Sequence, residues 1–204
     1  MNPAKQESSE LKRKHRERIT EIKKWIVSQP KNIPGWLLSN QYFRQARLDY
    51  LRFLIPENRR VLLLSCRTSE ILPALNPSFG VSVGFDTALL EDMREKYPHL
   101  KFIEGDIEDQ TLIKQIAQYA PFDVVLLDGV LGYLDDIQEF LSLIQTVCSK
   151  ETRVVSAYYG YLWEPMLRLA EKLRLRKRSF DTTWLRMGDV ENFMTLGGFE
   201  TIKK

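Results

Sequence analysis

The sequence predicts an α/β fold in which a mostly parallel sheet is covered by helices on both faces. From residue 60 onward, short apolar runs alternate with segments of helical periodicity, which is the pattern of right-handed βαβ units. Two of the runs, VLLL at 61–64 and VVLL within 122–128, are almost purely Val and Leu. Such runs are expected for strands that are buried on both faces.

The expected elements follow one another as strand and helix. Strands are predicted over 61–64, 81–85, 101–104, 122–128 and 152–159, and the helices that follow them over 69–75, 88–97, 111–120, 135–149 and 162–175. Two helices precede the first strand, over 5–28 and 40–54, and a last helix is predicted over 188–196. Pro and Gly near residue 34 indicate a linker. The domain boundaries that we expect are therefore 1–35 for a helical arm with its linker and 36–204 for the α/β domain.

Length and composition restrict the class of protein. The 204 residues suffice for one domain with a core, and 44% hydrophobic with 28% charged residues is typical of a globular protein. No apolar run is long enough to span a membrane, and the first residues form no secretory signal. With only two cysteines, Cys66 and Cys148, we expect no structural disulfide and a cytoplasmic location.

The charge is unevenly distributed along the chain. Residues 1–30 hold eight Lys and Arg against four Glu, while the whole chain has a net charge of only +3. This basic arm is either a solvated helix face or a weak contact site for anionic lipid or a partner. The small net charge gives no indication of a specific nucleic-acid site.

Three carboxylates mark the expected ligand-binding edge of the sheet. Asp86, Asp106 and Asp128 each lie at or just past the end of a predicted strand. In open parallel sheets, ligands bind beyond these strand ends, and a carboxylate there can accept hydrogen bonds from a ribose diol. The alternative for the first position is that Asp86 or Thr87 caps the following helix, and both roles can hold together if Thr87 is the cap.

At these residues the chain resembles a known family. The segments VLLLSCRTSEILPAL, VGFDTALLEDM, FIEGDIED, LGYLDD and YLWEPMLRLAE are similar to those of class I S-adenosylmethionine-dependent methyltransferases, which have a Rossmann-like three-layer sandwich. The resemblance is narrower with a bacterial subgroup often joined to a family 2 glycosyltransferase, and it covers about residues 40–204. It implies S-adenosylmethionine as cofactor, a small-molecule or saccharide acceptor, and an associated glycosyltransferase as a partner.

The resemblance also implies roles for single residues. Asp86, with Thr87 beside it, would bind the ribose hydroxyls of the cofactor, and Asp106 with the backbone of Ile107 would bind its adenine. Asp128 and the segment to Tyr133 would flank the methionine end and the acceptor, which makes these two residues the catalytic candidates. Tyr42 or Arg44, from the helix before the sheet, would close over the cofactor.

The cofactor loop departs from the family pattern. The family has an acidic residue and three glycines where this chain has, in order, Leu63, Ser65, Arg67 and Ser69. The loop therefore lacks the residues that allow close backbone approach to a ligand. Arg67 would either project into the space of the methionine moiety, point to solvent, or pair with the cofactor carboxylate.

Two features near the C-terminus also differ from the family. Arg186 stands where the family caps its last helix with Ser or Thr, although Asp189 can cap one turn later. GGFETIKK is expected to form the first strand of an antiparallel hairpin, and the last strand of the family sheet is absent from the sequence. A domain truncated at this hairpin would leave an unpaired sheet edge.

Three function classes follow from these observations. The first is a methyltransferase, and the second is an impaired, methyltransferase-like pseudoenzyme that serves as a binding or scaffold domain. A nicotinamide oxidoreductase is disfavoured because no G-x-G-x-x-G follows the first strand. No Cys, His and carboxylate cluster has the spacing of a metal site, so we expect no metal. His15 and His99 are expected at the surface.

Overall fold

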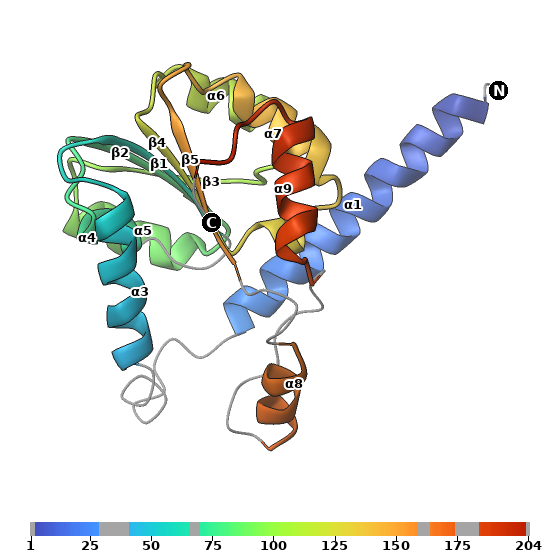
Figure 1. Cartoon of the computed structure of the whole chain (residues 1–204). Helices are drawn as coiled ribbons and strands as arrows, with labels where there is room; N and C mark the ends of the chain where they lie inside the picture. The colour runs from blue at the N-terminus through green and yellow to red at the C-terminus, as the bar shows by residue number, and fades with distance from the viewer. Residues whose placement is uncertain (1–2, 29–40, 66–69, 159–163, 174–183, 203–204) are drawn as a thin grey trace.

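The computed structural model describes residues 3–28, 41–65, 70–158, 164–173 and 184–202 (Figure 1). Its helices are α1 (Pro3–Ser28), α3 (Gln41–Leu54), α4 (Ile71–Ala74), α5 (Thr87–Lys96), α6 (Gln110–Ala117), α7 (Ile137–Gln145), α8 (Glu164–Lys172) and α9 (Met187–Leu196), with a 3-10 turn η1 at Leu131–Tyr133. Its strands are β1 (Arg60–Ser65), β2 (Phe79–Gly84), β3 (Lys101–Glu104), β4 (Val124–Asp128) and β5 (Arg153–Ala157).

The five strands form one parallel sheet in the order β3-β2-β1-β4-β5. This confirms the predicted α/β class and the strand–helix alternation from residue 60 onward. The order reverses at β1, because the chain runs outward through β2 and β3 on one side and returns to β4 and β5 on the other. The carboxyl ends of β1 and β4 therefore lie side by side at the switch point where open α/β sheets bind ligands.

Helices cover both faces of the sheet, which gives three layers (Figure 1). Alternate residues of β1 belong to different hydrophobic clusters, since Leu62 and Leu64 face one side while Val61 and Leu63 face the other. Helices α3, α4 and α5 pack on the second side, and α1, α6, α7 and α9 on the first. All four of these β1 side chains are 0% exposed, as expected for a central strand.

Helix α1 contributes to this core. Ile22 is 0% exposed and lies within the cluster that also contains side chains of β4, α6 and α7, while Ile19 and Trp25 pack against its edge. The remaining described side chains of α1 are mostly exposed and charged. Ile19, Ile22 and Trp25 therefore form the packing face of an otherwise charged helix. Among the described residues, no helix is both long and apolar enough to cross a membrane.

The C-terminal segment corrects one expectation. Residues 197–202 follow α9 without forming a strand, so the strand expected in GGFETIKK is not found over the part that the structure describes. Gly198 has a φ of +79° and the backbone N–H of Phe199 donates to the carbonyl of Met194 at 2.9 Å. The two glycines therefore end α9 with a tight helical turn, in which the positive φ favours Gly. Arg186 is the N-cap residue of α9, and its backbone N–H donates to the Asp189 carboxylate at 3.0 Å. Asp189 therefore lies in the first turn of α9, and the helix does not start one turn later at Asp189 as expected.

Candidate functional site

Ser65 and Asp128 form the centre of the switch point. They are paired in register at the ends of β1 and β4, and the Ser65 hydroxyl donates to Oδ2 of Asp128 at 3.4 Å. Both residues are buried, at 3% and 5% exposed. Gly84, at the end of β2, completes this edge, because a Cβ there would lie only 3.2 Å from the Ser65 carbonyl oxygen. The backbones of β1 and β2 therefore approach closely beside the candidate ligand site.

Asp128 is also bound by a helix that precedes the sheet. Arg47 of α3 forms an ion pair with Oδ1 of Asp128, and this contact was not predicted from the sequence. The two residues proposed for this helix lie elsewhere: Tyr42 is 85% exposed, and Arg44 binds Glu70 at 2.8 Å. The chain then changes direction at Gly129, whose φ of +67° favours a glycine.

Asp86 and Thr87 lie at the end of β2, and their roles differ from one of our expectations. Asp86 is the N-cap of α5, and its Oδ1 accepts from the backbone N–H of Leu89 at 3.1 Å. Thr87 is not the cap, because its hydroxyl donates to Glu104 at 2.8 Å. A carboxylate has two oxygens and several acceptor positions, so capping uses only part of the capacity of Asp86.

Asp106 follows β3 and is held on both of its oxygens. Oδ1 accepts from the backbone N–H of Glu108 at 3.0 Å, and Oδ2 lies 2.8 Å from Nε2 of His15. Ile107 beside it is 4% exposed. The prediction of a surface position for His15 is wrong, because only 27% of this side chain is exposed and both ring nitrogens face carboxylates.

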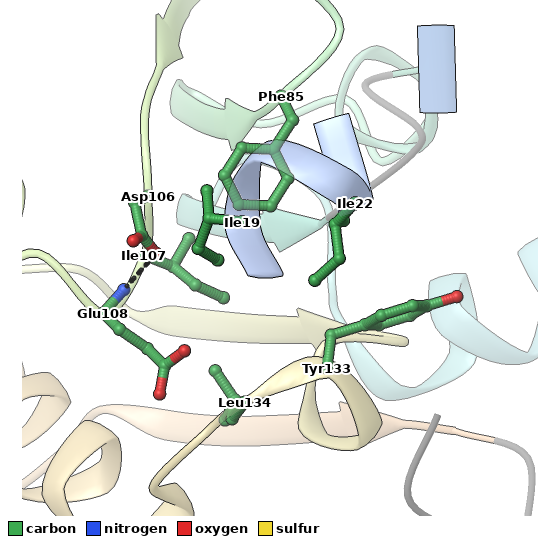
Figure 2. A pocket seen from close by; sticks show the side chains of 8 residues that line it. All are labelled: Ile19, Ile22, Phe85, Asp106, Ile107, Glu108, Tyr133 and Leu134. Carbon is green, nitrogen blue, oxygen red and sulfur yellow. Dashed lines mark hydrogen bonds between the residues drawn. The ribbon is translucent and has the colours of Figure 1, made fainter. Parts of the chain in front are cut away.

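Side chains of α1 fill the space beside Asp106. Ile19 and Ile22 point between Phe85 and Ile107 on one side and Tyr133 on the other (Figure 2). The cavity left among the described residues there is about 10 Å³, which is barely enough to hold one water molecule. An adenine ring therefore has room at this position only when α1 moves.

The loops after β3 and β4 meet at Glu108. Its Oε1 accepts from the backbone N–H groups of Asp135 and Asp136, at 2.9 and 3.1 Å. Burial raises the pKa of Glu108, and the two main opposing effects are the hydrogen bond from Asp136 and the nearby His15. Asp136 is the N-cap of α7, and its carboxylate accepts from the backbone N–H of Glu139 at 2.9 Å. The other aspartate, Asp135, pairs with Arg18 and with Nδ1 of His15.

Similar architectures occur among solved structures of methyltransferases. An S-adenosylmethionine-dependent methyltransferase from Thermotoga maritima aligns with a TM-score of 0.61 and 16% identity over 82% of this chain and 75% of that chain. One from Leishmania major aligns at 0.64 and 13% over 91% and 75%, and one from Mesorhizobium loti at 0.56 and 14% over 74% and 79%. The fold is that of class I methyltransferases. No family model and no curated protein matches the sequence.

In a class I methyltransferase fold, the loop after β1 is the expected neighbour of the cofactor. Of the four positions that depart from the family pattern, Leu63 and Ser65 are buried at the end of β1. Arg67 and Ser69 lie outside the described residues, as does Cys66. Tyr158, which directly follows β5, is partly buried.

Two of the side chains at this site could not be identified from sequence spacing. His15 is 91 residues from Asp106, and Arg47 lies in a helix that precedes the whole sheet. The sequence held one signal for His15. This residue lies four positions before the apolar Ile19, on a helix with eight Lys and Arg. Residues four apart share a helix face, so His15 and Ile19 face the same neighbour.

Proposed function

We propose that this chain is an S-adenosylmethionine-dependent methyltransferase domain that acts on a small-molecule or saccharide acceptor. The observation that carries the proposal is the placement of three acidic residues on this fold. Asp86 and Asp106 follow β2 and β3, Asp128 ends β4, and the three lie at the edge that contains the switch point between β1 and β4. Parallel α/β sheets bind nucleotide-like ligands at this edge.

The residues at this edge are of the chemical types that bind an adenosine. Asp86 offers a carboxylate for a ribose diol, while Phe85 and Ile107, both at least 95% buried, offer apolar contacts for a base. Asp106 would accept from the exocyclic amino group in place of His15. Because Ile19 and Ile22 occupy the space between these groups, binding requires α1 to shift away from the loops after β2 and β3.

The chemistry supplied by the bound cofactor would be an activated methyl group on a sulfonium. The chain would contribute orientation and exclusion of water, which can account for most of the rate of such a transfer. Asp128 and Tyr133 are the residues that we assign to the acceptor side. An acceptor hydroxyl must lose a proton, and Asp128 ends β4 while Tyr133 lies in the η1 turn that follows it.

A second candidate function is favoured by a specific observation. Ile19 and Ile22 of α1 fill the space proposed for the adenine ring. The cofactor loop has Ser65, Arg67 and Ser69 in place of glycines. Both features suit a methyltransferase-like domain that retains the fold as a binding or scaffold unit, with an associated glycosyltransferase as a proposed partner. Contact of the basic arm with anionic lipid and a cytoplasmic location also remain proposals.

Calorimetric titration with S-adenosylmethionine and with its demethylated product separates the two candidates. The enzyme proposal expects Kd below about 100 μM, roughly −5.5 kcal/mol. Asp86→Ser should remove most of this affinity while the serine still caps α5. Asp109→Ser is the matched control, because Asp109 caps α6 in the same way, accepting from Thr111 at 2.8 Å, and has no proposed ligand. No binding by the folded chain would favour the scaffold candidate.

A further inference from the structure

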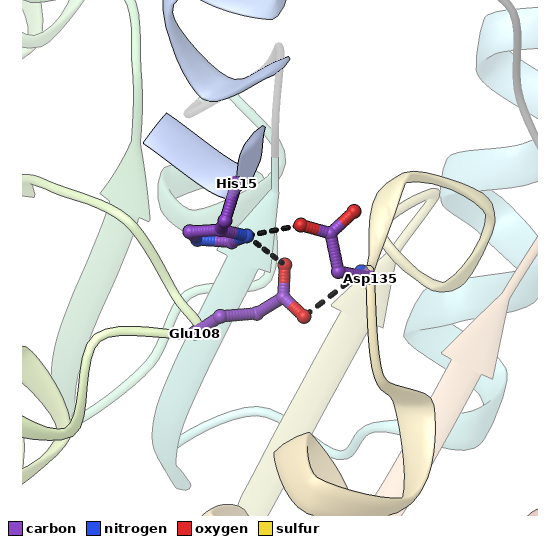
Figure 3. A group of neighbouring side chains, drawn as sticks. All are labelled: His15, Glu108 and Asp135. Carbon is purple, nitrogen blue, oxygen red and sulfur yellow. Dashed lines mark hydrogen bonds and ion pairs between the residues drawn. The ribbon is translucent and has the colours of Figure 1, made fainter. Parts of the chain in front are cut away.

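Three side chains from distant segments converge beside the cofactor site. His15 of α1, Glu108 after β3 and Asp135 after β4 each offer a ligand atom, and these atoms all lie within 4.8 Å of one another (Figure 3). Nδ1 of His15 is 3.9 Å from Oε2 of Glu108 and contacts Oδ2 of Asp135. A tetrahedral Zn²⁺ site, with bonds near 2.0–2.2 Å, needs its ligand atoms about 3.4 Å apart. Small side-chain movements therefore suffice.

Each of the three side chains has one polar atom bound to a partner outside this group of side chains. Nε2 of His15 lies 2.8 Å from Asp106, and Oε1 of Glu108 accepts two backbone N–H groups. Oδ1 of Asp135 pairs with Arg18. The second polar atom of each side chain, which is Nδ1 of His15, Oε2 of Glu108 and Oδ2 of Asp135, faces the other two. Protein metal sites are built in this way, with a carboxylate that orients the ring of the ligating His and partners that fix the ligating carboxylates.

The charges around this centre favour a cation. Among the described residues, Asp106, Glu108 and Asp135 place carboxylates around His15, and the guanidinium of Arg18 contacts one of them, Asp135. Nδ1 of His15 faces the carboxylates of Glu108 and Asp135. A divalent cation bound by Nδ1 and by one oxygen of each carboxylate would place positive charge between them.

We propose that His15, Glu108 and Asp135 form a site for one divalent transition-metal ion, of which Zn²⁺ is the best match. Mixed imidazole and carboxylate ligands suit Zn²⁺ better than Mg²⁺, which prefers oxygen alone. The fourth position would hold water. From the sequence we expected no metal, because no Cys, His and carboxylate cluster has the spacing of a metal site. His15 and Asp135 are 120 residues apart, and Asp135 and Glu108 are 27 apart, which is no known ligand spacing.

The site would fasten α1 to the domain. One ligand belongs to α1, and the other two belong to the loops after β3 and β4 at the switch-point edge. The metal would therefore keep His15 in contact with Asp106 and keep Ile19 in the space that we propose for the adenine ring. This consequence for the cofactor depends on the proposed function, whereas metal binding itself does not.

The test is a titration of the metal-free full chain with Zn²⁺ alone. The chain should carry Cys66→Ser and Cys148→Ser, because thiolates bind Zn²⁺ independently. We expect one ion per chain with Kd below about 10 μM. His15→Ala should weaken binding at least tenfold. His99→Ala is the matched control, because His99 is exposed and its ring packs on Tyr97. Mg²⁺ should not compete.

A second variant covers the case in which His15→Ala does not fold. Glu108→Gln keeps an acceptor oxygen for the N–H groups of Asp135 and Asp136 but removes the ligating charge, so we expect a loss of at least tenfold. Protection of α1 amides from hydrogen exchange should rise when Zn²⁺ is added. The proposal is overturned if the folded chain shows no saturable binding below about 100 μM. It is equally overturned if His15→Ala and Glu108→Gln both bind as the parent does, since the three residues would then be an ion-pair cluster only.

Discussion

Arg47 of α3 forms an ion pair with Asp128, which is the buried carboxylate at the end of β4. The Asp128 side chain is 4% exposed and that of Arg47 is 33% exposed, so the pair lies at the boundary between the core and solvent. A carboxylate in this position needs compensation, which Arg47 and the Ser65 hydroxyl supply. The helix before the sheet is thereby tied to the switch point, where we place the acceptor side of the site.

Arg47→Met should destabilise the fold, because it leaves the charge of Asp128 buried without its partner. Loss of one member of a fully buried pair costs roughly 3–5 kcal/mol. Since a third of Arg47 is exposed, we expect a smaller loss, about 1–3 kcal/mol in the free energy of unfolding. Urea denaturation followed by circular dichroism measures this difference. The double variant Arg47→Met with Asp128→Asn should recover part of the loss.

The matched control for this prediction is Arg44→Met on the same helix. Arg44 and Glu70 form an ion pair in which both side chains are more than half exposed. Exposed pairs contribute about 0–1 kcal/mol, so this change should have almost no effect. Equal losses for both substitutions would show that α3 itself, and not the charge of Asp128, governs the result.

Ile22→Ala should destabilise the whole domain if α1 is part of the core. Ile22 is 0% exposed and packs in the cluster with residues of β4 and α7. Removing three buried carbons from such a position costs roughly 2–4 kcal/mol. Glu21→Ala, on the exposed face of α1, is the control and should stay within about 0.5 kcal/mol. Chemical denaturation measures both, and an Ile22→Ala loss below about 0.5 kcal/mol would mean that α1 detaches without unfolding the domain.

Cys148 should be a slow nucleophile in the native protein. Burial raises the pKa of its thiol from 9.0 to about 11, so the thiolate is about 100-fold scarcer than in the unfolded chain at pH 8. In a Cys66→Ser background, we expect alkylation by iodoacetamide to be slow in buffer and fast in denaturant. Because the raised pKa favours the neutral thiol, this group stabilises the fold fully below pH 9 and loses that contribution between pH 9 and 11. Native alkylation as fast as the denatured reaction would contradict the burial of this thiol.

Binding at the proposed metal site and the proposed cofactor site should be antagonistic. His15 contacts Asp106, which we assign to the adenine, so one carboxylate oxygen serves both. We expect Zn²⁺ to weaken binding of S-adenosylhomocysteine by the chain several-fold, and S-adenosylhomocysteine to weaken Zn²⁺ equally, because linkage is reciprocal. His15→Ala should remove this coupling and raise the affinity for S-adenosylhomocysteine, while His99→Ala should change neither. Unchanged cofactor affinity at saturating Zn²⁺ would show that α1 does not obstruct the adenine side.

Much of the fold could be predicted because its signals are local. Apolar runs and helical periodicity along residues 60–158 were enough for the strands and their helices, and the predicted starts lie within a few residues of those observed. The parallel arrangement followed from the strand–helix alternation. The segment after α9 was predicted less well, because the expected strand rested on the resemblance and two glycines end the helix in a turn there instead.

The sequence by itself determined the class of fold and which carboxylates follow the strands. It did so because burial on two faces imposes a pattern that every buried strand must carry. Only the tertiary structure decided what these carboxylates contact. The partner of Asp106 is His15, and that of Asp128 is Arg47, and both come from helices that precede the sheet. Such pairs depend on how helices dock onto a finished sheet, and side chains brought together in this way leave no spacing in the sequence.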